Sequence, residues 1–202
     1  MRRTPPGALN SQFSTLTPTA VCVSGQSMAK IFVDRAASQN LSLIAIDEEE
    51  KVHAVMLNED WKEPPPVAYH SLASEWRPVR AAFNEVHTRF KAQQEFIQPG
   101  QMLHTLYFSC VRPEAAQQGV MGSLFNESIS VARDNNFREM CADTSSDGTA
   151  KLANNLGFDN TAALSYRDFF FDGVKVFDEL PAQNDQWTEL ATHKRKVPSD
   201  MY

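Results

Sequence analysis

The chain has 202 residues, of which 42% are hydrophobic and 22% charged, and its formal net charge is −6. This length suits one domain with a full core, and the composition is ordinary for a globular protein. The negative charge argues against a broad nucleic-acid surface, and no window is long and apolar enough to span a membrane. The three cysteines, Cys22, Cys110 and Cys141, have no paired spacing. We therefore expect neither a disulfide framework nor a zinc site, and a reducing, cytoplasmic setting.

The N-terminal part predicts a helix followed by a hairpin. Residues 1–16 are expected to be irregular. Thr17-Pro18 is typical of a helix start, an N-cap followed by proline at the first helical position, and this helix is expected to reach residue 40. Apolar strands over residues 41–46 and 52–57 flank a charged turn and predict a β-hairpin.

A long amphipathic helix is predicted over residues 75–96, after a proline-rich break. Its apolar positions recur every three or four residues, which is the helical period. These positions are Val79, Ala82, Phe83, Val86 and Phe90.

The central feature is a strand, a glycine-bearing turn and a helix. The apolar run over residues 103–111 ends before Pro113, which cannot donate to a central ladder. Gly119 and Gly122 follow, and apolar residues then take helical spacing over residues 119–135. This arrangement directs free backbone N–H groups and a helix N-terminus at one point, so it predicts a phosphate-binding site.

The C-terminal part alternates strands and helices. Strands are predicted over residues 138–142, 162–171 and within 186–193, with a helix over residues 147–156 and a turn at Asp172-Gly173. Cys110 and Cys141 are expected to lie in core strands. A flexible tail is expected over residues 196–202.

Three motifs in this order resemble the GNAT superfamily of acetyl-CoA-dependent N-acetyltransferases. Val111-Arg112-Pro113 matches the family's strand end, Gly119 falls on the first glycine of its pyrophosphate loop, and Leu156-Gly157-Phe158 matches its last motif. The resemblance implies an α/β (α+β) three-layer fold with a mixed, mostly antiparallel central sheet flanked by helices. It covers roughly residues 41–193, and we expect one domain over residues 17–195.

The closer likeness is to the arylalkylamine or dopamine N-acetyltransferase branch. It rests on the serine-rich segment over residues 144–150, the aromatic ending over residues 166–177, and the helical insertion over residues 60–100. This branch implies direct attack of a small-molecule primary amine on acetyl-CoA, with the insertion covering the acceptor site. No metal, nucleic acid or membrane takes part, and the protein is expected to be a monomer or homodimer.

The resemblance assigns acetyl-CoA contacts to the central strand, the loop and the last helix. They are Cys110, Val111, Gln117, Gln118, Gly119, Val120, Met121, Gly122, Ser123 and Asn154. The loop departs from the family pattern, because Met121 stands at the final Gly/Ala position when Gly119 is the first glycine. In the alternative interpretation, Gly119 only shapes the turn and Gly122 allows close packing of the helix.

Four residues are candidates for the chemistry: His104, Tyr107, Ser145 and Thr149. His104 is the leading base because histidine titrates near neutral pH, although a lone strand histidine is more often structural. The family's acidic N-terminal turn has no counterpart here, and Ala153 occupies the position of its tyrosine acid. Ser146 and Asp147 are interpreted as helix caps.

The remaining histidines, His53, His70, His87 and His193, are scattered along the chain and suggest no metal site. Trp61, Tyr69 and Trp76 lie in or near the insertion and could contact an aromatic amine. Two other functions stay open: a GNAT-fold protein that binds acyl-CoA without turnover, and an unrelated α/β nucleotide binder.

Overall fold

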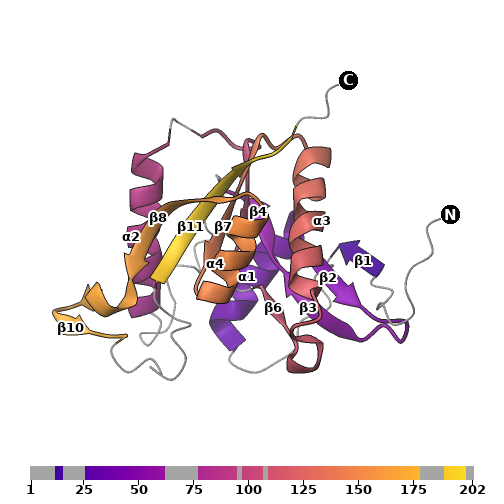
Figure 1. The fold of residues 1–202 in the computed structure, drawn as a ribbon, viewed down its shortest axis with the longest axis horizontal. Coiled ribbons are helices and arrows are strands. Elements are labelled where there is room, and N and C mark those ends of the chain that lie inside the picture. Colours follow the sequence, from indigo (N-terminus) through magenta and orange to yellow (C-terminus); the bar gives the residue numbers. More distant parts are fainter. Residues whose placement is uncertain are drawn as a thin grey trace.

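The computed structural model describes residues 12–15, 26–61, 77–94, 97–106, 109–177 and 189–198. Within these residues two sheets lie between helices on both faces (Figure 1). Thr17-Pro18 and residues 62–76 lie outside the described residues, so the predicted helix start and most of the proline-rich break are not tested.

The first sheet has four antiparallel strands. In spatial order they are β1 (Gln12–Thr15), β2 (Leu43–Ile46), β3 (Val52–Met56) and β6 (Cys110–Val111). The predicted β2–β3 hairpin is confirmed. The prediction of an irregular segment over residues 1–16 is wrong for β1, because a strand partner distant in sequence supplies its backbone pairing.

The second sheet has five strands. In spatial order they are β4 (Asn58–Asp60), β5 (Met102–Thr105), β7 (Glu139–Thr144), β11 (Glu189–Lys196) and β8 (Asp159–Ser165). Only β5 and β7 pair in parallel, and the other neighbours are antiparallel. The predicted mixed, mostly antiparallel sheet is therefore confirmed.

The single strand predicted over residues 103–111 is divided between the two sheets. β5 pairs with β4 in the second sheet, whereas β6 pairs with β3 in the first. Val55 pairs with Cys110 and Asn58 pairs with Thr105. Between these two pairs, three positions separate Val55 from Asn58, but five separate Thr105 from Cys110 in the opposing segment. The longer side cannot keep the ladder continuous, so the strand is interrupted between Thr105 and Cys110.

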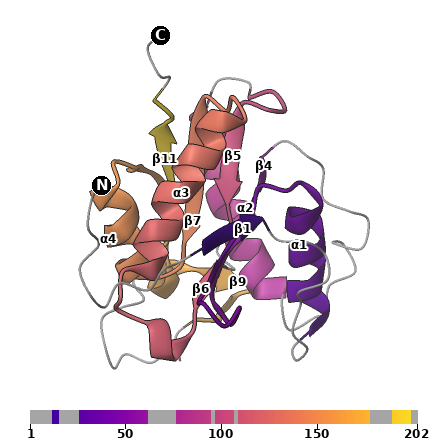
Figure 2. The same cartoon turned by 90° about the vertical axis from the view of Figure 1, so that its right-hand side faces the viewer.

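Four α-helices of the described part of the chain form the outer layers. They are α1 (Gln26–Ser38), α2 (Arg77–Ala92), α3 (Val120–Asp134) and α4 (Asp147–Asn155). Figure 2 shows α3 and α4 on one side of the sheets and α1 and α2 on the other. Short 3-10 turns, η3 (Pro113–Ala115) and η4 (Tyr166–Asp168), and the hairpin of β9 (Phe170–Phe171) and β10 (Val174–Lys175) complete the fold. None of the described helices is long and apolar enough to cross a membrane.

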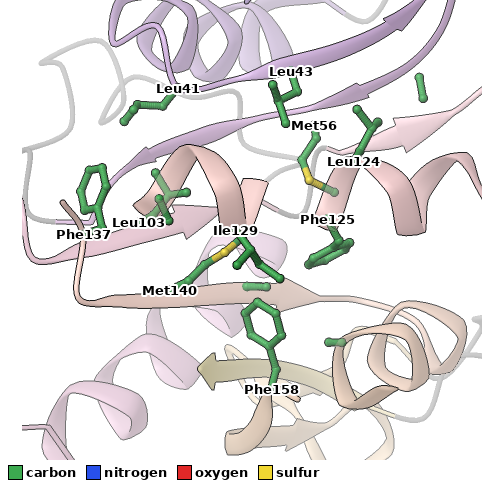
Figure 3. Packing of buried hydrophobic residues seen from close by; sticks show 14 of the residues in the cluster. Leu41, Leu43, Met56, Leu103, Leu124, Phe125, Ile129, Phe137, Met140 and Phe158 are labelled. Atoms are coloured by element: carbon green, nitrogen blue, oxygen red, sulfur yellow. The ribbon is translucent and has the colours of Figure 1, made fainter. Parts of the chain in front are cut away.

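Each helical layer buries its own apolar cluster. On the α3 side, Leu103, Phe125, Met140 and Phe158 pack together (Figure 3). On the α2 side, the predicted stripe is confirmed. Ala82, Phe83, Val86 and Phe90 are all buried, and Val79 packs against the same cluster.

The two strand cysteines differ in their surroundings. Cys141, in the central strand β7, is buried, but Cys110 is exposed, so its predicted core position is wrong. In the described part of the chain β6 is an edge strand of its sheet, with β1 at the other edge.

Candidate active site

β6 and the end of β7 are not paired with each other, and we call the region between them the opening. The last pair between β5 and β7 is Thr105 with Ala142, yet β7 continues to Thr144. Beyond this pair the chain from β5 goes over to β3, where Cys110 lies opposite Val55. β5 and β7 are therefore neighbours, whereas β6, which follows β5 in the chain, pairs with β3 and not with β7.

At the edge of β6 that faces this opening, the Val111 backbone groups have no hydrogen-bond partner among the described residues. The Arg112 N–H donates to the His53 carbonyl at 2.8 Å, so Arg112 points its polar backbone groups at β3. Successive residues of an antiparallel strand alternate in this direction. The N–H and C=O of Val111 consequently point away from β3, toward the opening.

The loop after β6 ends at the N-terminus of α3. Gly119 is the N-cap residue and has a φ of 79°, a left-handed conformation that favours glycine. Gln117, with a φ of 62°, shares this region. The first bond of the helix runs from the Ser123 N–H to the Gly119 carbonyl, at 3.0 Å.

The N–H groups of Val120, Met121 and Gly122 precede that bond and have no partner within the helix. No side chain among the described residues caps them. The Met121 side chain packs against the core, so methionine at this position leaves the backbone donor available. A Cβ on Gly122 would meet Leu152 of α4 at 3.6 Å, an ordinary contact, so Gly122 marks the packing of α3 on α4.

The other predicted acetyl-CoA contacts are solvent-facing. Gln117, Gln118, Ser123 and the α4 residue Asn154 are exposed. The Gln118 side-chain amide donates to the Glu114 carbonyl at 2.9 Å and so helps to hold the loop. Tyr107 lies outside the described residues.

The serine-rich segment is the N-terminal cap of α4. Ser146 is the N-cap, and its hydroxyl accepts from the Thr149 N–H at 3.4 Å and lies 2.5 Å from the Thr149 hydroxyl. The interpretation of Ser146 as a cap is confirmed. The Ser145 carbonyl accepts a hydrogen bond from the Tyr166 hydroxyl at 3.2 Å. Burial, with Asp147 nearby, raises the pKa of Tyr166 to about 12, so this phenol remains a donor at neutral pH.

Ala153, at the position of the family's tyrosine acid, is fully buried in the core cluster on the α3 side. No polar group is available there.

His104 lies in a buried network of charges under α2. Its Nε2 atom is 2.9 Å from Asp143 Oδ2 and its Nδ1 atom is 3.3 Å from Glu59 Oε1. Glu59 in turn pairs with Arg35 of α1, with 2.9 Å between Nε and Oε2. Burial by itself would lower the pKa of His104, but the Asp143 and Glu59 carboxylates outweigh it and raise the pKa to about 9.

Both ring nitrogens of His104 therefore donate to carboxylates, and the ring is an imidazolium at neutral pH. A cation without a free lone pair cannot accept a proton, so this geometry opposes the base role predicted for His104. A single sequence carries no sign of the two carboxylates that surround it.

His87 joins the same network from α2. Its Nε2 atom lies 3.0 and 2.9 Å from the two oxygens of Asp143. The Thr192 hydroxyl donates to Asp143 Oδ1 at 2.8 Å. Burial would raise the pKa of Asp143, but His87 and His104 hold it well below the usual range. Asp143 is thus an anion with three donors around it.

His87, His104 and Asp143 have the residue types of a metal site, and their ligand atoms lie within 4.8 Å of one another. Each histidine already meets Asp143 at hydrogen-bond distance. Glu59 and Asp143 are balanced in charge by Arg35 and His104. The cluster is electrostatically complete without an ion, and we describe it as a hydrogen-bonded charge network.

No protein-family model matches the sequence, and no curated protein matches it. Solved structures do match the fold over nearly the whole chain. Arylalkylamine N-acetyltransferase 2 from Aedes aegypti is similar with a TM-score of 0.77 and 15% identity, covering 94% of this chain and 100% of that one. The chain has the GNAT fold.

Two further N-acetyltransferases share this fold with the chain. The Drosophila melanogaster polyamine N-acetyltransferase, described as forming N-acetylagmatine, has a TM-score of 0.71 and 15% identity over 93% of this chain and 100% of that one. An agmatine N-acetyltransferase has a TM-score of 0.70 and 19% identity over 86% of this chain and 82% of that one. At these identities the likeness establishes the GNAT fold, and the chemistry has to be argued from this chain's own residues.

The loop and the N-terminus of α3 were predictable from the sequence, whereas the charge network was not. Asp143 and Glu59 lie on different strands, and Arg35 and Thr192 come from α1 and β11. The Asp143 carboxylate directly after the apolar residues Met140, Cys141 and Ala142 was a signal in the sequence, because buried carboxylates need partners.

Proposed function

We propose that the protein is an N-acetyltransferase that transfers the acetyl group of acetyl-CoA to the primary amine of a small molecule. The observation that carries this proposal is the opening between β6 and β7, with the N-terminus of α3 beside it. A thioester with a long diphosphate-bearing arm suits such a site, because this ligand needs an anion-binding site and an unpaired strand edge close together. We propose that residues 17–195 form one catalytic domain, with the insertion over residues 60–100 on the acceptor side.

Each part of acetyl-CoA has a proposed place. The N–H groups of Val120, Met121 and Gly122 would hold the diphosphate, since orphan donors and the helix dipole both favour an anion. The free N–H and C=O of Val111 would hydrogen-bond the amide-bearing arm. Gln117, Gln118, Ser123 and Asn154 line the exposed approach, and Cys110 lies on the same strand edge.

Acetyl transfer requires the protein to align the amine with the thioester and to stabilise the negative charge that develops on oxygen and sulfur. The amine nitrogen attacks the thioester carbonyl, and backbone N–H groups near the interrupted strand stabilise the oxyanion. Tyr107 and Ser145 are the proposed donors to the departing thiolate. The hydroxyl groups of Thr149 and Ser146 contact each other, so we assign Thr149 to the α4 cap before any chemical role.

A second function is favoured by one observation. Ala153 is buried where the family has its tyrosine acid, which is compatible with a GNAT-fold protein that binds acyl-CoA without turnover. Acetyl transfer to tyramine, dopamine or agmatine would rule this out. A general nucleotide binder would not distinguish acetyl-CoA from ATP.

The first experiment is thermal unfolding with acetyl-CoA, desulfo-CoA and ATP at matched concentrations. Specific binding at a hundredfold excess over the dissociation constant stabilises the folded state by about 2.7 kcal/mol. We expect both CoA compounds to raise the melting temperature and ATP to leave it unchanged. Equal shifts with all three ligands, or no shift with either CoA compound, would contradict the proposal.

The Gly119→Ala variant tests the loop directly. Alanine at a φ of 79° costs about 1–2 kcal/mol, so the variant should be less stable and should bind acetyl-CoA more weakly. Gly148→Ala is the matched control, since Gly148 lies in α4 with open space where a Cβ would stand and without a left-handed φ. Isothermal titration of both variants measures the difference. Equal affinities would argue against the proposed diphosphate site.

A further inference from the structure

We infer that His87 and Asp143 act as a proton-accepting dyad, in which His87 removes a proton from the substrate ammonium group. This inference rests on the proposed function and assigns the general base of the proposed acetyl transfer. The dyad replaces His104, whose two nitrogens both donate to carboxylates.

The hydrogen bonds of His87 leave one nitrogen available. Its Nε2 atom donates to Asp143, and Nδ1 makes no hydrogen bond to the part of the chain that the structure describes. A neutral imidazole that donates from Nε2 carries its lone pair on Nδ1. His87 therefore has the tautomer and the free site that a base requires.

Exposure selects the same residue. The side chain of His87 is 23% exposed, whereas those of Asp143 and His104 are 1% and 4% exposed. Of these three side chains, His87 therefore has the largest surface in contact with solvent. Asp143 lies behind it and cannot meet a substrate itself.

Asp143 is held as an oriented anion. Thr192 donates to one carboxylate oxygen and His104 to the other, so the carboxylate cannot rotate away from His87. An ionised carboxylate at the Nε2–H stabilises the imidazolium that forms when Nδ1 takes a proton. The buried charge network thus prepares His87 for this role.

The dyad lies beside the opening. Asp143 is one residue past Ala142, the last β7 residue that pairs with β5, on the side of the sheet that α2 covers. Trp61 and Phe83 flank the His87 ring, with centroid distances of 4.8 and 6.0 Å. The buried Trp61 indole N–H has no acceptor among the described residues. An amine with an apolar or aromatic body, and a polar atom for this donor, fits these surroundings.

Other charged and titratable groups near His87 come from several elements. Lys91 of α2 lies over the Trp61 ring, and His104 lies 5.6 Å from His87 between ring centroids. Glu59, paired with Arg35, lies on the far side of His104. The buried Cys141 thiol has a pKa raised by burial and by Asp143, so it stays neutral. Among these described groups, His87 alone combines access to solvent with a ring nitrogen that makes no hydrogen bond.

The proton balance is complete. Nδ1 forms a bond to one ammonium proton, and the N–H electron pair remains on the amine nitrogen as its lone pair. That nitrogen bonds to the thioester carbon, and the C–S bond breaks as the oxyanion collapses. The second proton shed by nitrogen neutralises the thiolate, and His87 returns its proton to solvent. The products are the amide, CoA thiol and one proton.

The test compares kcat/KM across pH for the wild type and for His87→Gln. If a side chain accepts the substrate proton, wild-type kcat/KM falls as pH drops. His87→Gln should lose about a hundredfold in kcat/KM near neutral pH, the lower end for general base catalysis, with an unchanged dissociation constant for acetyl-CoA. A wild-type profile in His87→Gln would overturn the inference.

Two readouts separate proton transfer from a structural effect. Added imidazole should restore part of the activity of His87→Ala. A fluorinated amine that is already neutral at the assay pH should show a much smaller defect with His87→Gln than the parent amine does. Absence of both effects would leave His87 a structural residue and contradict the inference.

His53→Gln is the matched control, because His53 also pairs with a carboxylate, Asp47, at 2.7 Å, but on the β2–β3 hairpin. It should keep the wild-type profile. If the wild type neither binds acetyl-CoA nor acetylates any amine, the proposed function fails, whereas normal turnover by His87→Gln removes only the dyad. Loss of wild-type activity in a chelator, with recovery on adding zinc, would replace the dyad by a metal site.

Discussion

Two carboxylates, Glu59 and Asp143, lie under the α1–α2 layer with two cations beside them. Taking an unpaired charge out of water costs several kcal/mol, so each carboxylate needs its partner. His104 lies between both carboxylates and is cationic for that reason. At this scale, the chemistry of a histidine is decided by its neighbours, and the same ring type is a charge in His104 and a candidate base in His87.

His104 predicts a loss of stability at alkaline pH. Its pKa is raised from 6.5 to about 9 in the folded protein, so protonation favours folding. The contribution is fully present below about pH 6.5 and is lost as pH rises through 9; its size is on the order of 3 kcal/mol. Urea unfolding at pH 6.5, 8 and 9.5 measures it. His104→Gln should flatten this slope, and an equally steep slope in that variant would assign it to other groups.

The helix α2 is stabilised by packing, and the apolar stripe in its sequence identifies the packed face. Its apolar stripe meets β8 and β11, and the polar face carries Arg89 and Lys91 near the C-terminal end. Phe90 is fully buried and contacts Trp61 edge to face, at 5.3 Å between centroids. The same helix presents His87 to the network, so packing of the stripe positions the proposed base.

Truncation of Phe90 tests this element. Phe90→Ala removes a fully buried ring and should lower the free energy of unfolding by about 3–5 kcal/mol. Phe170→Ala is the matched control, because Phe170 is 56% exposed and its removal should change stability by less than about 0.5 kcal/mol. Chemical denaturation of both variants provides the measurement. Similar losses would contradict the assigned packing.

At the scale of the whole molecule, two sheets are connected by chain segments that run from one sheet into the other. β3 continues into β4 across the junction, and β5 and β6 lie opposite them. The opening arises because the segment that joins β5 to β6 is longer than the segment that joins β3 to β4. Arg35 ties α1 of one side to Glu59 of the second sheet, which places one end of the charge network at the boundary between the layers.

Removal of Arg35 should therefore weaken the whole molecule. Arg35→Met leaves the two buried carboxylates, Glu59 and Asp143, with His104 in place of two cations and should cost about 3–5 kcal/mol. Lys30→Met is the matched control on α1, because the Lys30 side chain is 64% exposed and its i,i+4 pair with Asp34 contributes little. Thermal unfolding compares the two. A small effect of Arg35→Met would mean that the network does not join the layers.

The local periodicities of the sequence determined much of the fold. The stripe of α2, the glycine before α3, the cap of α4 and the β2–β3 hairpin each follow from spacing within a short segment. These features depend on neighbours in sequence, so they were predictable. The proposed anion site at the N-terminus of α3 is of the same kind.

Only the tertiary structure decided what depends on residues distant in sequence. The pairing of β1, the exposure of Cys110 and the interruption after Thr105 follow from strand partners elsewhere in the chain. The charge of His104 and the placement of His87 beside Asp143 follow from three separate elements. Because electrostatic interactions act through space, the protonation state of a buried group cannot be derived from its position along the chain.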